Sequence, residues 1–212
     1  WIRNTVDDAI AAAELLRQAG CEPLLFHARF AMQDRLAIER EVLRRFGRES
    51  GGDDRRCVLV ATQVIEQSLD IDFDLLVTDL APVDLLIQRA GRLWRHARPN
   101  RVVPEPELLV VSPEPVDQPT ANWIMASLPG AGMVYRDHAL LWRSAREIFR
   151  RGAIATPEDM RPLIEAAFDQ DTPGAVPPAL TRPAGEAYAK ELSQVDFAKQ
   201  NVLDLKAGYD AN

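Results

Sequence analysis

The 212-residue sequence is poor in lysine, and this shortage excludes one kind of nucleotide site. The three lysines are Lys190, Lys199 and Lys206, and none of them follows a glycine. A Gly-rich phosphate-binding loop ends in Lys and then Ser or Thr, so the chain carries no such loop. An Asp-Glu pair placed after a strand, which would suit magnesium and water activation, is missing as well.

Histidine, cysteine and long apolar runs are also scarce. The sequence has three histidines and two cysteines: His27, His96, His138, Cys21 and Cys57. They show no metal-ligand spacing, so we assign no metal, and the cysteines are typical of reduced core thiols in a cytoplasmic protein. No signal peptide and no membrane-spanning apolar run is present. Because the chain starts at Trp1 inside an expected strand and without an initiator Met, we interpret it as a fragment of a longer protein.

Positive charge is limited overall. The net charge is −7, which argues against a general nucleic-acid binder with a basic surface. Residues 1–101 hold 15 basic and 16 acidic side chains, whereas residues 102–212 hold 10 and 16. Phosphate binding therefore belongs to local patches in the first half, and the acidic second half is better suited to packing or to a partner.

Strands and amphipathic helices alternate along the first half. Strands are expected at residues 1–3, 23–26, 58–61, 75–78 and 108–111, with helices beginning after Asn4 or Thr5 and spanning residues 33–46. This β-α-β-α-β order predicts an α/β fold with a parallel sheet and right-handed crossovers.

The polar loop after residues 58–61 is the strongest indication of a site. Ligands of open α/β sheets bind at the carboxyl ends of strands, where this loop must lie. In the helix expected after Pro82, the i, i+4, i+7 spacing of Gln88, Arg92 and Arg95 predicts one shared face. Guanidinium groups match phosphate oxygens, so the pattern predicts a phosphate site.

Two of these stretches together resemble a known family. ATQVIEQSLDID (61–72) is similar to motif V, and QRAGRLWR (88–95) to motif VI, of the second RecA-like lobe of superfamily 2 helicases. His27, Arg35 and Phe46 fit the strand and arginine-bearing helix of motif IV. Most families of this superfamily have a glycine before the Leu-Asp of motif V, where this chain has Glu66-Gln67-Ser68. This form of the motif most resembles the CRISPR-associated helicase–nuclease of type I systems.

The resemblance implies two regions. Residues 1–112 would form a RecA-like parallel sheet with flanking helices. Residues 113–212 would form a Pro-rich linker and a helical accessory region, including a long helix at 184–206. YRDHALLWRSAREI and PEDMRPLIEAAF are similar to the helical region after the second lobe of that family.

The resemblance also implies roles for single residues in nucleotide binding. Arg92 and Arg95 would be arginine fingers, Gln88 would lie near the terminal phosphate, and Asp70 would touch the ribose or link the nucleotide to motif VI. The alternative for both arginines is an ion pair with Asp70 or Asp72. ATP and magnesium would be shared with a first lobe that the chain lacks.

Further residues are candidates for nucleic-acid contacts or for internal bonds. Thr62, Gln63, Arg29 and Arg35 would contact the tracked strand, although a local ion pair is an equal alternative for Arg29 and Arg35. Arg89 faces away from Gln88, so we expect it to bond the sheet or the motif V loop. We interpret Asp72 and Asp74 as structural, and the basic loop 96–101 either contacts DNA or is solvated.

Family membership implies a motor that moves 3′ to 5′ on single-stranded DNA, is recruited by a crRNA-guided surveillance complex and degrades the invader. The family's metal nuclease is not carried here, since Asp137-His138 has the reverse order and no partner ligands. Two alternatives remain open: a lobe of another superfamily 2 translocase or RNA helicase, and a non-enzymatic docking module.

Overall fold

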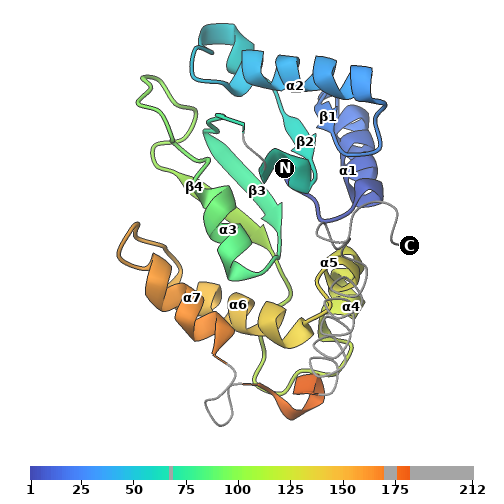
Figure 1. The fold of residues 1–212 in the computed structure, drawn as a ribbon, viewed down its shortest axis with the longest axis vertical. Coiled ribbons are helices and arrows are strands. Elements are labelled where there is room, and N and C mark those ends of the chain that lie inside the picture. Colours follow the sequence, from blue (N-terminus) through green and yellow to red (C-terminus); the bar gives the residue numbers. More distant parts are fainter. Residues whose placement is uncertain (67–68, 170–175, 182–212) are drawn as a thin grey trace, which may run out of the picture.

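The computed structural model describes residues 1–66, 69–169 and 176–181 (Figure 1). The first half consists of α1 (Val6–Gln18), β1 (Leu24–Phe26), α2 (Met32–Phe46), β2 (Leu59–Ala61), β3 (Leu75–Asp79), α3 (Val83–Ala90) and β4 (Glu107–Val111). Two 3-10 turns, Gly52–Arg55 and Gln63–Glu66, flank β2. The second half contains α4 (Trp123–Ser127), α5 (Pro129–Val134), α6 (His138–Arg151) and α7 (Met160–Phe168).

The sheet consists of two parallel pairs joined at one residue. Strand β1 pairs with β2, and β3 pairs with β4. Ile2 forms parallel bridges to Ala61 of β2 and Thr78 of β3, so it connects the two pairs. The predicted strand at residues 1–3 is thus reduced to bridges at Ile2, while the predicted α/β fold with a parallel sheet is confirmed.

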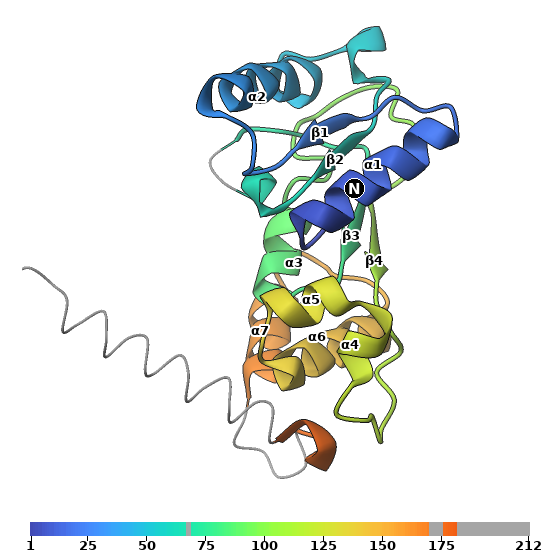
Figure 2. The same ribbon diagram turned by 90° about the vertical axis from the view of Figure 1, so that its right-hand side faces the viewer.

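Helices cover both faces of the β1–β2 pair because side chains alternate along β2. Val60 packs against Ala9 and Ala12 of α1. The neighbouring strand residues point the other way, into the cluster that contains Val42 and Phe46 of α2. Figure 2 shows α1 and α2 on either side of these strands.

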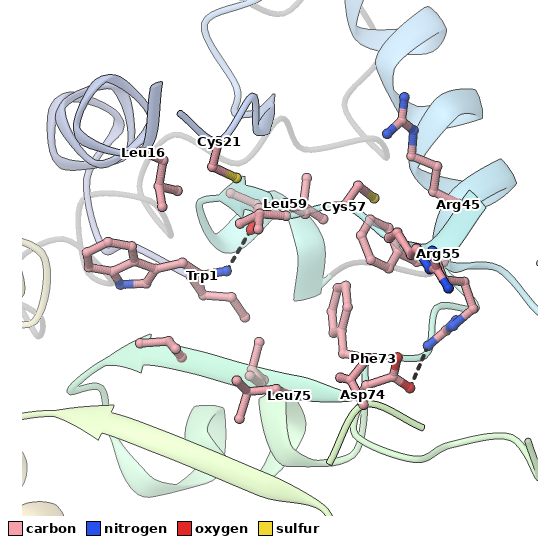
Figure 3. Close-up of a pocket in the computed structure, with 18 of the residues that line it drawn as sticks. Trp1, Leu16, Cys21, Arg45, Arg55, Cys57, Leu59, Phe73, Asp74 and Leu75 are labelled. Carbon is pink, nitrogen blue, oxygen red and sulfur yellow. Dashed lines mark hydrogen bonds and ion pairs between the residues drawn. The ribbon is translucent and has the colours of Figure 1, made fainter. Parts of the chain in front are cut away.

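A mostly apolar cavity of about 600 Å³ separates the two halves of the sheet near the amino ends of β2 and β3 (Figure 3). Trp1, Phe73 and Leu75 line it together with both free cysteines, Cys21 and Cys57. The cavity also reaches Ala61, at the carboxyl end of β2, and Ile65 of the motif V stretch.

The helical region packs directly on the lobe. Leu80 and Leu86 share one buried cluster with Trp123, Leu141 and Trp142 of the helices. In addition, the backbone N–H of Val83 donates to the buried Ser144 hydroxyl at 3.1 Å. The division of the chain near residue 112 remains a prediction, and the apolar core continues across it. The predicted helix at 184–206 lies outside the described residues.

No helix within residues 1–66, 69–169 and 176–181 combines the length and apolar character needed to cross a membrane.

Candidate functional site between motifs V and VI

The predicted helical face of Gln88, Arg92 and Arg95 is wrong for the two arginines, because α3 ends at Ala90. Gly91 follows as the C-cap, and the N–H of Arg92 turns back to the carbonyl of Arg89 at 3.0 Å. Trp94 then adopts a left-handed backbone conformation with φ 46°. Only Gln88 stays on the helix, where its side chain is exposed.

After leaving the helix, the chain pairs with the end of the motif V stretch. Leu93 forms a parallel bridge with Phe73. The N–H of Phe73 donates to the carbonyl of Arg92 at 2.8 Å, and the N–H of Trp94 donates to the carbonyl of Phe73 at 3.1 Å. This local pairing explains the early helix end, since it satisfies backbone groups that another helical turn would otherwise use. It also fixes motif VI beside motif V.

Arg92 braces the motif V loop. Its guanidinium donates to the carbonyl oxygens of Leu69 and Glu66, the second at 2.9 Å from Nη2. Burial, reinforced by the positive charge of Arg95, lowers the pKa of Arg92 below its ordinary value. Two guanidinium groups that repel each other in this way favour an anion beside them.

Arg95 forms the ion pair that was the alternative to a finger role. Its Nε lies 2.9 Å from Oδ1 of Asp70, and the two side chains are 47% and 51% exposed. An ion pair this exposed contributes little to stability. Arg95 is therefore held near the loop by a contact that another anion can replace at low cost.

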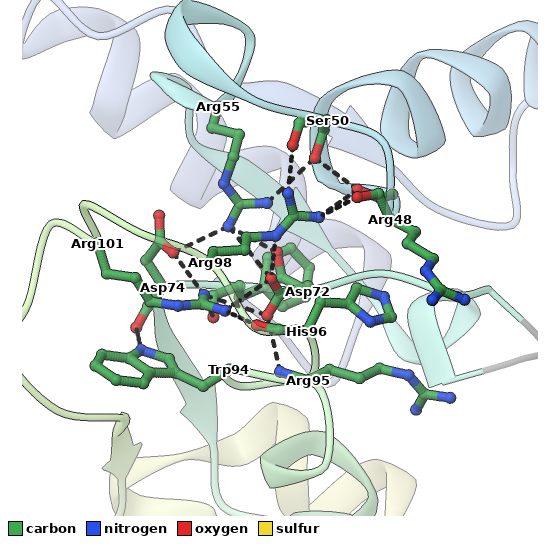
Figure 4. Close-up of polar contacts among 12 residues, drawn as sticks. Arg48, Ser50, Arg55, Asp72, Asp74, Trp94, Arg95, His96, Arg98 and Arg101 are labelled. Carbon is green, nitrogen blue, oxygen red and sulfur yellow. Dashed lines mark hydrogen bonds and ion pairs between the residues drawn. The ribbon is translucent and has the colours of Figure 1, made fainter.

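Asp72 is a buried carboxylate surrounded by arginines, as Figure 4 shows. Oδ2 accepts from Arg101 at 3.0 Å and also from Arg98, while Arg55 lies 3.9 Å away. Oδ1 accepts the backbone N–H of Arg95 at 2.9 Å. The interpretation of Asp72 as structural is confirmed.

Burial raises the pKa of the Asp72 carboxyl, but the hydrogen bonds from Arg101 and Arg98 and the charges of Arg101 and Arg55 outweigh it. The net pKa lies below the ordinary value, so Asp72 is ionised at neutral pH. We had expected the basic loop 96–101 either to contact DNA or to be exposed to solvent. Both hypotheses are wrong for Arg98 and Arg101, whose side chains fold inward onto this carboxylate.

Arg89 bonds the sheet and the motif V loop, as predicted. Its side chain is fully buried. Nε donates to Oε1 of Glu66 at 2.7 Å, and Nη1 donates to the hydroxyl of Thr78 at 2.6 Å. Nη2 donates to the hydroxyl of Tyr135 at 3.2 Å, a contact from the helical region that nothing in the sequence pattern indicated.

Three of the four predicted nucleic-acid residues follow two neighbouring strands. Thr62 and Gln63 come after β2 and Arg29 after β1, at positions that the β1–β2 register places on the same edge. Thr62 is buried, and Gln63 donates to the carbonyl of Asn4 at 2.8 Å. Arg29 forms the local ion pair that was the alternative to a nucleic-acid contact, with Asp7 at 2.5 Å.

The structure gives less information on the remaining predicted site residues. Arg35 is half-buried on α2, and its side chain forms no hydrogen bond or ion pair within the described residues. Gln67 and Ser68, which distinguish this motif V from the glycine-bearing form, lie outside the described residues. Where the chain is described, no group of His, Cys, Asp and Glu could hold a metal ion.

Comparison with known proteins agrees with this geometry. Residues 1–98 match the family model described as CRISPR-associated nuclease/helicase Cas3, C-terminal. The chain is 42% identical over 163 residues to the CRISPR-associated endonuclease/helicase Cas3 of Thermus thermophilus, covering 74% of this chain and 16% of that protein. It is 34% identical over 176 residues to Cas3 of Escherichia coli, covering 79% and 18%.

Solved structures share the fold over nearly the whole chain. The crystal structure of T. fusca Cas3-ATP is 36% identical, has a TM-score of 0.77 and covers 94% of this chain and 22% of its own. A CRISPR RNA-guided surveillance complex in its pre-nicking state contains a chain with 36% identity and a TM-score of 0.74, covering 95% and 24%. The present chain spans less than a fifth of the length of these two curated relatives. It belongs to the Cas3 family of CRISPR-associated nuclease/helicases, and its RecA-like fold corresponds to a helicase lobe in the C-terminal region of that family.

Proposed function

We propose that the chain is the second motor lobe of an ATP-dependent translocase on single-stranded DNA that degrades invader DNA in type I CRISPR interference. The observation that carries the proposal is the contact of motif VI with motif V near the amino end of β3, where Arg92 donates to the carbonyls of Glu66 and Leu69 and Arg95 pairs with Asp70. The chain has no phosphate-binding loop of its own. The lobe supplies cations for hydrolysis and contacts for the DNA strand, and is inactive alone.

The residues of motif VI and the motif V loop fit one side of a nucleotide. Arg92, Arg95 and Gln88 offer N–H donors for phosphate oxygens, and Asp70 is an exposed acceptor suited to ribose hydroxyls. ATP with magnesium, when bound, supplies a terminal phosphoryl group whose transfer develops negative charge on its oxygens. A first RecA-like lobe of the same parent protein would provide the phosphate loop and the metal ligands.

Arg92 and Arg95 contribute differently to that role. Arg92 is partly desolvated, and two backbone carbonyls hold its guanidinium. The side chain therefore loses little further conformational entropy when it binds a phosphate. Arg95 is exposed and exchanges Asp70 for another anion. Together they place positive charge where charge develops during hydrolysis, which is the main protein contribution to phosphoryl transfer.

The nucleic-acid contacts belong to the carboxyl ends of β1 and β2 and to the neighbouring helix α2. We assign Thr62, Gln63, Arg29 and Arg35 to the DNA backbone, since hydroxyl, amide and guanidinium donors commonly bind phosphate oxygens. Arg35 is the most available cation of this group, whereas Arg29 must first leave Asp7. The match to a chain in an RNA-guided surveillance complex supports such a complex as the partner of the parent protein.

The proposal predicts that Arg95→Ala lowers DNA-stimulated ATP turnover on the order of a hundredfold in the enzyme that contains this chain, because one stabilising cation is lost. The matched control is Arg161→Ala on α7, which removes an exposed arginine paired with Glu165 and should leave turnover unchanged. Turnover is measured at saturating ATP and DNA. Equal rates for the two variants would contradict the assignment of Arg95.

A further inference from the structure

Arg89 is a buried cation at the point where three parts of the molecule meet. Its side chain has no exposed surface. It contacts the motif V loop through Glu66, strand β3 through Thr78, and the helical region through Tyr135. A buried guanidinium is tolerated only when its donors are satisfied, so each contact constrains where the other two can lie.

Tyr135 is the contribution of the helical region to this junction. It is the C-cap residue of α5, directly after a helix whose Gly130–Gly132 segment is buried. Its hydroxyl accepts from Nη2 of Arg89 at 3.2 Å and is also hydrogen-bonded to Gln63, and burial raises its pKa. The phenol therefore remains a neutral hydrogen-bonding group at physiological pH.

The junction leads to a proposed catalytic cation through Glu66. The carboxylate of Glu66 binds Arg89 at 2.7 Å, and its backbone carbonyl accepts from Nη2 of Arg92 at 2.9 Å. A continuous series of contacts thus runs from the Tyr135 hydroxyl through Arg89 and Glu66 to Arg92. A shift of α5 that displaces the hydroxyl changes how Glu66 is held, and with it the carbonyl that orients Arg92.

We propose that Tyr135 is a positioning residue through which the helical region sets the orientation of Arg92, so that ATP turnover depends on how that region is seated on the lobe. The inference rests on the proposed function of Arg92 as a catalytic cation. It assigns a role in regulation to a helical region that carries no catalytic side chain of its own among its described residues.

The test uses Tyr135→Phe in the enzyme that contains this chain, because phenylalanine keeps the ring and removes only the hydroxyl. We expect kcat for DNA-stimulated ATP hydrolysis to fall about fivefold, the effect of one lost hydrogen bond, while KM for ATP stays unchanged. Ser144→Ala is the matched control: it removes the buried bond between α6 and Val83 without touching Arg89. It should leave kcat unchanged even where it lowers the melting temperature.

A double-mutant cycle with Glu66→Gln separates coupling from general destabilisation. If Tyr135 and Glu66 act through Arg89, the double variant loses less kcat than the product of the two single losses. Multiplicative losses, an unchanged kcat in Tyr135→Phe, or an equal loss in Ser144→Ala would overturn the inference. Full turnover in Arg92→Ala would instead overturn the proposed function, so the two failures are distinguishable.

Discussion

Asp72 connects several segments of the site, which its position in the sequence does not indicate. Its carboxylate accepts from Arg98 and Arg101 of the segment after motif VI, and Arg55, which precedes β2, lies 3.9 Å away. It also accepts the backbone N–H of Arg95, so it fixes the turn that presents the exposed guanidinium. A charge buried this deeply is stable only because several cations and hydrogen bonds compensate its desolvation.

Asp72→Asn should therefore lower the free energy of unfolding by roughly 3 kcal/mol at neutral pH, because it leaves buried arginines without their anion. The pKa of Asp72 is depressed in the folded protein, so its stabilisation is complete above the unfolded pKa and is lost as pH falls. The difference between wild type and variant should shrink below about pH 4. Urea unfolding at pH 7 and pH 3.5 measures both values.

Asp53→Asn is the control for this prediction, since Asp53 is 89% exposed and pairs only with its neighbour Arg56 among the described residues. It should behave as wild type at both pH values. A constant difference between wild type and Asp72→Asn from pH 7 to pH 3.5 would contradict the electrostatic account of Asp72.

The partners of a single residue were predictable when the sequence offered only a few candidates. Arg89 was expected to bond the sheet or the motif V loop, and it contacts both. The inward folding of Arg98 and Arg101 was not predictable, because a basic stretch after a helix looks the same whether its partner is solvent, DNA or a buried carboxylate. Tyr135 gave no signal, since its partner lies 46 residues away in the sequence.

At the scale of helices and strands, the end of α2 shows how closely neighbouring elements approach. The carbonyl of Gly47 accepts from Nη2 of Arg98 at 2.6 Å, which ties the end of α2 to the segment after motif VI. A Cβ at Gly47 would lie 2.3 Å from the backbone oxygen of Leu43. The helix end and this segment therefore depend on the absence of a side chain at one position.

Gly47→Ala should destabilise the protein by about 1–3 kcal/mol, because a backbone oxygen cannot move aside without distorting the last turn of α2. Gly51→Ala is the matched control, with no atom within 4 Å of the new methyl group. Thermal unfolding followed by circular dichroism compares the two. Similar melting temperatures for both variants would contradict the steric reason.

The sequence predicted most elements of the lobe because strong patterns marked them. The buried row of Val42 and Phe46 and the apolar runs at β2 and β3 indicated their type and order. The end of α3 was missed for a physical reason: Leu93 pairs with Phe73, and a spacing rule for one helix cannot include a contact with a distant strand end.

The whole molecule combines a RecA-like lobe with helices that share its core. Leu80 and Leu86 lie in the same buried cluster as Trp123 and Leu141, so the helical region is more than a linker. The second half was expected to serve packing or a partner, and this cluster shows the packing, but the Pro-rich composition after Ser112 did not indicate which residues form it. It connects the helices to α3, the helix that directly precedes Arg92 and Arg95.

The central claim is that this lobe supplies the cations for ATP hydrolysis, and Arg92→Ala in the enzyme that contains this chain tests it most directly. The measurement is kcat for DNA-stimulated ATP hydrolysis, with ATP affinity determined in parallel and circular dichroism confirming the fold. We predict a fall in kcat on the order of a thousandfold with ATP affinity changed only slightly. A variant that is folded and keeps wild-type turnover would contradict the account.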